Sequence, residues 1–206
     1  MINSLIPSSI ILENDRALIR TLTAADYDFL LPFSLNEPEL WYYSLRSGEG
    51  GENLALYLKS ALEDKEKGND YPFIIYDKLK DAYAGTTRFY DIQASYKTLQ
   101  LGYTWYGADF QGTGLNKNCK YLLLQYAFEE LGMERVEFRA DSENSRSVAA
   151  MKSIGCTVEG ILRNHMPNAQ GGRRNSIILS ILKEEWFNIV KAALKAKLLV
   201  PISLKI

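Results

Sequence analysis

The sequence feature that most constrains the fold is a glycine-containing hexapeptide, Gln111-Gly112-Thr113-Gly114-Leu115-Asn116. It follows a predicted β-strand that ends near Tyr106 and directly precedes a predicted amphipathic helix over residues 116–131. Two glycines let the backbone approach a ligand closely, and the free N–H groups of the loop and first helical turn point in one direction. The positive end of the helix dipole reinforces them. The segment therefore predicts a pyrophosphate site at a strand-to-helix junction.

Other phosphate-binding loops have different spacings. A P-loop requires Gly-x-x-x-x-Gly-Lys-Ser/Thr, and the chain contains no such string. A dinucleotide fingerprint, Gly-x-Gly-x-x-Gly, would need glycine or alanine where Lys117 stands, although Asp141 could imitate its ribose-binding acid. A nucleotide-dependent oxidoreductase and a plain glycine-rich turn therefore remain alternatives for the hexapeptide taken alone.

Hydrophobic periodicity predicts an α/β chain. Apolar residues at i, i+3, i+4, i+7 and i+8 between Glu52 and Lys67 indicate an amphipathic helix, and the same stripe returns after Asn116. Three runs rich in aliphatic and aromatic residues, 71–77, 82–91 and 99–106, predict an antiparallel meander. The other predicted elements are a strand at 17–22, a helix capped by Thr23, a strand at 135–140, a helix at 144–154, strands at 156–164 and 176–182 joined by a turn at 171–174, and a C-terminal helix at 183–199.

Length and charge limit the class of protein. At 206 residues the chain is long enough for one α/β domain and short for two, so we expect a single domain over 1–206. A formal net charge of −1 provides no global positive field for a nucleic-acid backbone. The start lacks the pattern of a signal peptide, no run reaches the length of a membrane span, and Cys119 and Cys156 belong to no metal-spaced cluster. We therefore expect a cytoplasmic protein without nucleic-acid, membrane or metal binding.

Two motifs in this order resemble those of the GNAT superfamily of N-acetyltransferases. The family signature Gln/Arg-x-x-Gly-x-Gly/Ala matches at Gln111 and Gly114 and departs at Asn116. Downstream, the run 141–147 opens a predicted helix that stops at Gly155, which resembles the family's Asn-x-x-Ser/Ala helix and its glycine stop. Two motifs in the right order and at the right separation are far more specific than either motif alone.

The resemblance covers roughly residues 15–186 and is closest to the branch that contains the ribosomal-protein N-terminal acetyltransferases. It implies a mixed sheet of about seven strands, flanked by helices and splayed by a bulge in the fourth strand, here 99–106. It also implies an acetyl-CoA-dependent enzyme whose acceptor is a primary amine, either a protein N-terminus or a small molecule. A catalytically inactive GNAT-like module that binds acyl-CoA or serves in regulation is the alternative. A homodimer is compatible with both.

By this resemblance, main-chain groups would hold most of the cofactor. The N–H groups of residues 111–116 would bind the pyrophosphate, and the backbone at Thr104 would run beside the pantetheine arm like an added strand. An N–H near Trp105 or Tyr106 would stabilise charge on the thioester oxygen. The predicted cofactor-binding residues are Thr104, Trp105, Tyr106, Gln111, Gly112, Thr113, Gly114, Leu115, Asn116, Asn144 and Ser147.

The catalytic groups follow the family pattern less closely. Many members carry a glutamate base on the fourth strand, but the corresponding position holds Gln100, which cannot usefully accept a proton. The tyrosine that many members use to protonate the departing thiolate aligns with Met151. The nearest related branch suggests Ser147 as proton donor instead. The only histidine, His165, is a candidate base, and a structural or exposed role for it stays open.

Aromatic residues are candidates for the wall of the acceptor pocket. Tyr103 and the run Trp41-Tyr42-Tyr43 could line it. Aromatic clusters in an amphipathic context usually belong to the core, so both interpretations stay open. The sequence does not predict which amine is the acceptor.

Overall fold

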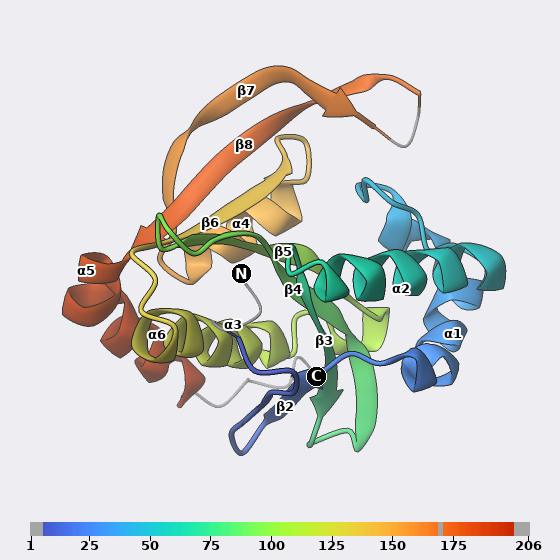
Figure 1. Ribbon diagram of the computed structural model, residues 1–206, viewed down its shortest axis with the longest axis horizontal. Coiled ribbons are helices and arrows are strands. Elements are labelled where there is room, and N and C mark those ends of the chain that lie inside the picture. Colours follow the sequence, from blue (N-terminus) through green and yellow to red (C-terminus); the bar gives the residue numbers. More distant parts are fainter. Residues whose placement is uncertain (1–5, 169–170, 200–206) are drawn as a thin grey trace, which may run out of the picture.

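The computed structural model describes residues 6–168 and 171–199, and these form an eight-stranded mixed sheet with helices on both faces (Figure 1). The strand order is β1-β2-β3-β4-β5-β6-β8-β7. Only the pair β5–β6 is parallel among the described strands. The strands are β1 Ile11–Glu13, β2 Ala17–Thr21, β3 Tyr71–Asp77, β4 Ala82–Gln93, β5 Thr98–Tyr106, β6 Arg135–Asp141, β7 Thr157–Pro167 and β8 Arg173–Leu182.

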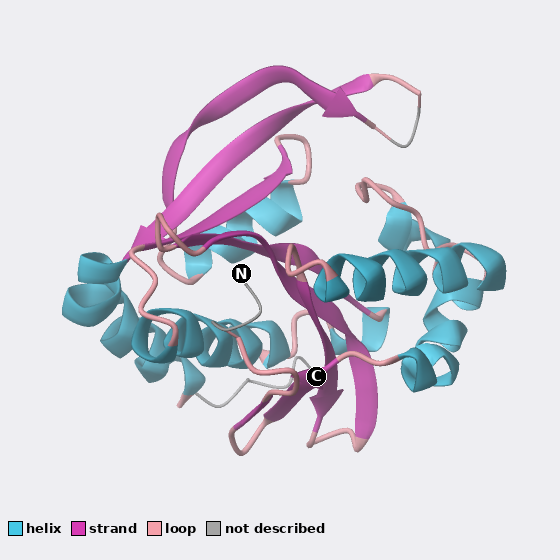
Figure 2. Ribbon diagram, viewed as in Figure 1, coloured by secondary structure: helices cyan, strands magenta, loops and turns pink. Residues whose placement is uncertain are grey.

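The helices lie where hydrophobic periodicity predicts them (Figure 2). They are α1 Tyr27–Asn36, α2 Gly51–Glu66, α3 Leu115–Gln125, α4 Ser145–Ser153, α5 Lys183–Glu185 and α6 Lys191–Leu198. A π-helical segment, Tyr126–Glu130, extends α3, and a second one, Trp186–Val190, joins α5 to α6. In the described part of the chain, no helix combines the length and the apolarity that crossing a membrane requires.

The sheet has one strand more than the sequence predicts. β1 pairs antiparallel with β2 through Ile11 to Glu13, at the edge of the sheet. It was missed because a three-residue strand is too short for an alternation of apolar and polar residues to be recognised. The seven predicted strands and their order are confirmed. The turn predicted at 171–174 falls only partly on described residues, since 169–170 lie outside them and Arg173 already begins β8.

The sheet opens between β5 and β6. The two strands pair only through residues 98–100 and 135–137, and β5 then diverges from β6. A bulge marks the divergence, because Arg88 pairs with Gly102 while Thr86 pairs with Trp105, which leaves two residues of β5 opposite one of β4. Tyr103, inside the bulge, has a left-handed backbone with φ of 48°. The predicted splay at the 99–106 strand is therefore confirmed.

Two hydrophobic cores hold the helices against opposite faces of the sheet. The larger core joins α3 and the C-terminal helix to one face, and Trp186 stacks there on Phe128 at 5.7 Å between ring centroids. The smaller core joins α1 and α2 to the other face through residues such as Leu30 and Leu54, both fully buried. This arrangement places the opening of the sheet between two rigid layers.

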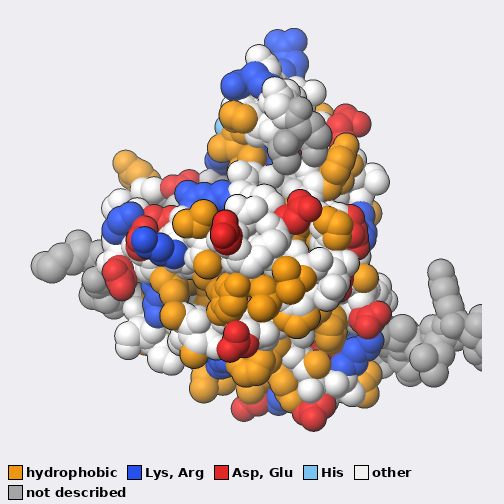
Figure 3. Space-filling view, turned by 90° about the vertical axis from the view of Figure 1, so that its right-hand side faces the viewer, with side chains coloured by type: hydrophobic (Ala, Val, Ile, Leu, Met, Phe, Trp, Pro, Cys, Tyr) orange, Lys and Arg blue, Asp and Glu red, His pale blue; other side chains and the backbone are white. Residues whose placement is uncertain are grey.

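One outer surface carries many apolar side chains. Figure 3 shows them gathered on the side of the molecule where α1 and α2 lie in Figure 1. Phe29, Leu35 and Leu56 on these helices are 49%, 59% and 63% exposed. A surface of this kind is a candidate contact for a second copy of the chain. The homodimer itself stays a prediction.

Candidate active site

The loop before α3 has the shape of an anion cradle. Gly112 and Gly114 both adopt left-handed backbone angles, with φ of 73° and 82°. A Cβ atom built on Gly112 would meet nothing within 4 Å, so the face of the loop is open. The Gln111 side chain holds the loop to the preceding strand, because its Nε2 donates to the carbonyl oxygen of Tyr106 at 2.7 Å. Thr113 Oγ1 donates to the carbonyl of Phe110 at 2.7 Å.

The N–H groups of this loop are available to a ligand. Among the described residues, none accepts a hydrogen bond from the backbone N–H groups of residues 112–116. The side chain of Leu115 is fully buried, so only its backbone can contribute. The hydroxyl of Tyr106 donates to Asn116 Oδ1 at 3.3 Å, which ties the end of β5 to the first turn of α3. The departure from the family signature at Asn116 thus has a structural role.

The second motif lies beside the first. Arg146, on the first turn of α4, donates to the side-chain oxygen of Gln111. Asn144 caps the same helix by accepting a hydrogen bond from the backbone N–H of Ser147 at 3.0 Å. Sequence reasoning missed Arg146 although it stands inside the quoted motif. It brings a positive charge to the cradle, and an arginine two residues after a helix cap was the available signal.

The edge of β5 that faces β6 has free backbone groups. Beyond residue 100 this edge has no pairing with another described strand. Trp105 and Tyr106 have buried side chains, each 8% exposed, and Trp105 is fixed by Trp41 at 5.2 Å between centroids. Thr104 is half-buried. A rigid strand with an unpaired edge is suited to receive an extended ligand as an added strand.

A cavity of about 350 Å³ lies over the other end of β4 and β5, toward α2. Its polar lining contains three carboxylates and one guanidinium, so its formal charge is negative. The lining residues are Arg46, Asp64, Asn69, Asp70, Tyr90, Asp91, Ile92, Gln93 and Tyr103. They come from the loop before α2, from α2 itself, from the α2–β3 loop and from two strands, which no local motif connects.

A carboxylate stands next to the position where the family glutamate is absent. Gln100 is 5% exposed, and its Nε2 donates to Asp91 Oδ2 at 2.6 Å. The side-chain oxygen of Gln100 has no partner among the described residues. Asp91, in turn, lines the cavity and has a left-handed backbone with φ of 48°. Sequence reasoning missed Asp91, since cross-strand pairing and not sequence spacing brings it to Gln100.

Tyr103 belongs to this cavity, whereas Trp41 does not. The Tyr103 ring lies 4.1 Å from the Arg88 guanidinium carbon, and Arg88 pairs with Asp70 at 2.9 Å. Burial raises the pKa of Tyr103 and, against the opposing effect of Arg88, also that of Asp70. Trp41 is 3% exposed and packs in the core, so of the two interpretations left open for it the core one applies.

The two tyrosines after Trp41 are on the surface. Tyr42 and Tyr43 are 55% and 39% exposed and are not among the residues that line the cavity. The hydroxyl of Tyr43 donates to the carbonyl of Glu143 at 3.3 Å, one residue before the cap of α4. This contact links the loop before α2 to the β6–α4 loop.

His165 is held on the β7–β8 hairpin. Its Nδ1 lies 3.0 Å from Ser176 Oγ, which also accepts a hydrogen bond from Arg174 Nε. Partial burial, followed by the charges of Arg139 and the neighbouring arginines of β8, lowers the pKa of His165. His165 is not among the residues that line the 350 Å³ cavity, so the structure does not bring it to Asp91.

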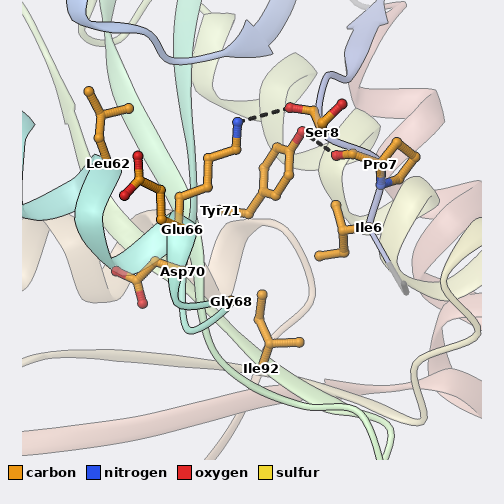
Figure 4. A pocket seen from close by; sticks show the side chains of 10 residues that line it. Ile6, Pro7, Ser8, Leu62, Glu66, Gly68, Asp70, Tyr71 and Ile92 are labelled. Carbon is orange, nitrogen blue, oxygen red and sulfur yellow. Dashed lines mark hydrogen bonds between the residues drawn. The ribbon is translucent and has the colours of Figure 1, made fainter. Parts of the chain in front are cut away.

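A larger cavity, of about 410 Å³, lies outside this arrangement (Figure 4). It is bounded by the N-terminal segment, which is held where Tyr71 donates to the carbonyl of Pro7 and Lys65 to that of Ser8, at 2.7 and 2.9 Å. It shares Asp70 and Ile92 with the smaller cavity but has no lining residue from β5 or the loop before α3. The smaller cavity is therefore the better candidate for an acceptor site.

Comparisons with known proteins identify a family. The family model described as an acetyltransferase (GNAT) domain matches residues 16–157. The uncharacterized N-acetyltransferase p20 of Bacillus licheniformis is 26% identical over 176 residues, which cover 85% of this chain and 97% of that protein.

Two solved structures have the same fold. A GCN5-related N-acetyltransferase from Brucella melitensis has a TM-score of 0.85 at 24% identity, with 93% of this chain and 86% of that chain covered. Mycobacterium smegmatis RimJ, solved in complex with CoA-disulfide, has a TM-score of 0.78 at 16% identity, with 94% and 96% covered.

Proposed function

The chain belongs to the GNAT acetyltransferase family and is an acyltransferase, and we propose that it transfers the acetyl group of acetyl-CoA to a primary amine. The observation that carries this proposal is the unpaired edge of β5, which leads through a short 3-10 turn, Ala108–Phe110, into the open loop at residues 111–116. The edge offers backbone partners for a long polar arm, and the loop offers N–H donors for a pyrophosphate. No other described part of the chain combines the two.

The residues present fit acetyl-CoA. The loop N–H groups and Arg146 would hold the pyrophosphate, since both supply positive potential at the same place. The backbone of Thr104 to Tyr106 would hold the pantetheine arm, and an N–H near Trp105 or Tyr106 would stabilise the thioester oxygen. The bound cofactor supplies an activated acetyl group.

The acidic cavity favours a cationic acceptor. Asp64 pairs with Arg46 and Asp70 with Arg88, so among the described lining residues Asp91 is the carboxylate without a cationic partner. A protonated primary amine would meet this uncompensated negative charge. Asp91 is placed to accept a hydrogen bond from the amine and to orient it, and the buried Gln100 amide fixes that carboxylate. A protein N-terminus and a small-molecule amine both meet this description.

Proton movement is assigned to three groups. Asp91, directly or through water, or His165 would take the proton that the amine releases before attack. The Ser147 hydroxyl, half-buried one helical turn after the Asn144 cap, would donate a proton to the leaving thiolate. The Ser147 backbone N–H donates to the Asn144 cap, and the hydroxyl takes no part in that contact, which leaves it for this role.

Calorimetry with acetyl-CoA and an acceptor screen that follows release of free thiol test the proposal together. We expect binding of acetyl-CoA, no binding of NADH, and transfer to cationic amines in preference to neutral ones. Absence of heat and of a thermal shift at millimolar acetyl-CoA would refute it. Binding without transfer to any amine would instead identify a module that only binds the cofactor.

A further inference from the structure

Lys120 is buried without a carboxylate partner. It lies in the middle of α3 with 5% of its surface exposed, and among the described residues it forms no ion pair. Its Nζ donates to Thr104 Oγ1 at 2.8 Å and, weakly, to Thr87 Oγ1 at 3.5 Å. It also lies 5.8 Å from the centroid of the Phe138 ring on β6. Removing a charge from water in this way is unfavourable, so a buried cation of this kind calls for an explanation.

The two hydroxyls that receive these hydrogen bonds span the bulge of β5. In the bulge, Thr87 of β4 stands opposite two residues of β5, Tyr103 and Thr104. The hydroxyl oxygens of Thr87 and Thr104 are 2.7 Å apart. Both hydroxyls lie within hydrogen-bond distance of the Gly102 carbonyl, at 3.3 and 3.4 Å. An ammonium can only donate, so both hydroxyls must accept from it and direct their own protons onward. The cation therefore orients the whole network across the bulge.

A second buried cation holds the bulge from the opposite face. Arg88 packs on the Tyr103 ring and is neutralised by Asp70. It is 2% exposed, as deeply buried as Lys120, but its charge is compensated. The unpaired cation thus lies on the α3 face, and the paired one lies on the face of the acidic cavity.

We propose that Lys120 is a positioning residue for the cofactor: its ammonium, acting through Thr87 and Thr104, maintains the bulge that keeps the edge of β5 away from β6. The inference rests on the proposed binding of acetyl-CoA along that edge. The proposed role requires that Lys120 is protonated. A neutral amine is a weaker donor and can itself accept a hydrogen bond, so it would no longer force the two threonine hydroxyls to act as acceptors.

The surroundings of Lys120 make its charge testable by pH. Burial lowers the pKa of Lys120 to about 8, and the titratable groups that act on it are the thiols of Cys119, beside it on α3, and Cys156, just before β7. Burial raises the pKa of each thiol to about 12, so both stay neutral when Lys120 titrates. The hydroxyls of Thr87 and Thr104 and the ring of Phe138 carry no charge.

Stability and binding then change in opposite directions with pH. An unfolded lysine has a pKa of about 10.4, so between about pH 8 and pH 10 the unfolded chain binds more protons than the folded one. The contribution of Lys120 to stability therefore rises with pH in this window, while affinity for acetyl-CoA falls. Acetyl-CoA has no free thiol, so its reacting end does not titrate there.

The experiment combines Lys120→Met with Thr104→Val and the double variant. Met keeps the length of the side chain and removes the charge, so we expect an unchanged or higher Tm at pH 7 and an affinity for acetyl-CoA that is roughly 10-fold lower. Thr104→Val removes the best partner of the buried ammonium, so we expect a lower Tm, which the double variant restores. Lys195→Met, the same change at an exposed position of α6, should alter neither quantity.

If the wild-type chain binds acetyl-CoA, three results would overturn the proposed role of Lys120. They are an unchanged affinity in Lys120→Met, additive effects in the double variant, or a loss of Tm in Lys120→Met that accounts for the loss of affinity. If Lys120→Met does not fold, the affinity of the wild-type chain for acetyl-CoA is measured between about pH 7.5 and 9.5 instead. An affinity that does not change over this range would contradict the requirement for a charged Lys120. Failure of the wild-type chain to bind acetyl-CoA at any pH would refute the proposed function itself.

Discussion

The two halves of the candidate active site, which we call the cofactor half and the acceptor half after their proposed roles, are built on different principles. The cofactor half consists of the loop at 111–116, the free edge of β5 and the first turn of α4, and it offers mainly backbone N–H groups with one arginine. The acceptor half is the 350 Å³ cavity, and it offers side chains, among them three aspartates. The two halves carry opposite potentials, so the proposed polyanionic cofactor and the proposed cationic amine would each be directed to its own side.

The halves also differ in how many parts of the chain build them. Two short motifs, brought together by the contact of Arg146 with Gln111, supply the cradle of the cofactor half. The acceptor half depends on the pairing of β4 with β5 and on the packing of α2 above them. Substitutions on the cofactor side should therefore act locally and strongly on binding, and those on the acceptor side should act on turnover.

The largest effect is expected from Gly114→Glu on the cofactor side. The change places a side chain and a negative charge at a left-handed position in the cradle, so affinity for acetyl-CoA should fall by at least about 100-fold in calorimetry. Gly132→Glu is the matched control, because Gly132 also has a left-handed φ, of 65°, and lies at the other end of the same helical segment. An unchanged affinity in a folded Gly114→Glu variant would show that the cradle assignment is wrong.

Asp91→Asn tests the acceptor side with a smaller effect. Asparagine tolerates the left-handed backbone at this position, so the fold should persist. Loss of the carboxylate should lower kcat/KM for the amine by about 10- to 100-fold, with unchanged affinity for acetyl-CoA. Asp28→Asn, at an exposed position of α1, should behave as wild type. If Asp91→Asn lost affinity for acetyl-CoA instead, the two halves would not be separable.

Ser147→Ala tests a residue at the boundary of the two halves. It should lower kcat by roughly 10-fold with little change in affinity for acetyl-CoA, because a proton donor helps only as the thiolate leaves. Ser145→Ala, two residues earlier on the exposed side of α4, is the control. A lost affinity with an unchanged kcat would make Ser147 a binding residue.

The smallest effect is expected for His165→Gln, and it concerns pH only. The pKa of His165 is lowered from its ordinary value of 6.5. A catalytic His165 would act as a base only when neutral, so the rate would rise as the pH increases through this lowered pKa. If His165 takes the proton, the variant should lose this step; if Asp91 or water takes it, the rate at pH 8 should change little. An identical pH–rate profile in wild type and variant would remove His165 from the reaction.

The acceptor half could not be predicted from sequence for a physical reason. Asp91 and Gln100 are nine residues apart, yet their hydrogen bond depends on the register of β4 against β5. The choice left open at Trp41 has the same origin, because only the packing of Tyr57 and Trp105 around its ring assigns it to the core. The signal for Lys120 was weak, because its apolar neighbours Leu124 and Ala127 on the same side of α3 are ordinary in a helix.

The splay of the sheet was predicted only through the family resemblance. The sequence by itself determined the order of the elements and the strand-to-helix loop with its second motif. These depend on local periodicity, on glycine backbone freedom and on motif spacing, all of which act within a few residues. Only the tertiary structure decided which charges meet: Asp91 lies beside Gln100, Arg88 pairs with Asp70, and Lys120 lies beneath the bulge without a carboxylate partner among the described residues. Charges are compensated or left unpaired by neighbours in space, and strand register and helix packing, not sequence distance, choose those neighbours.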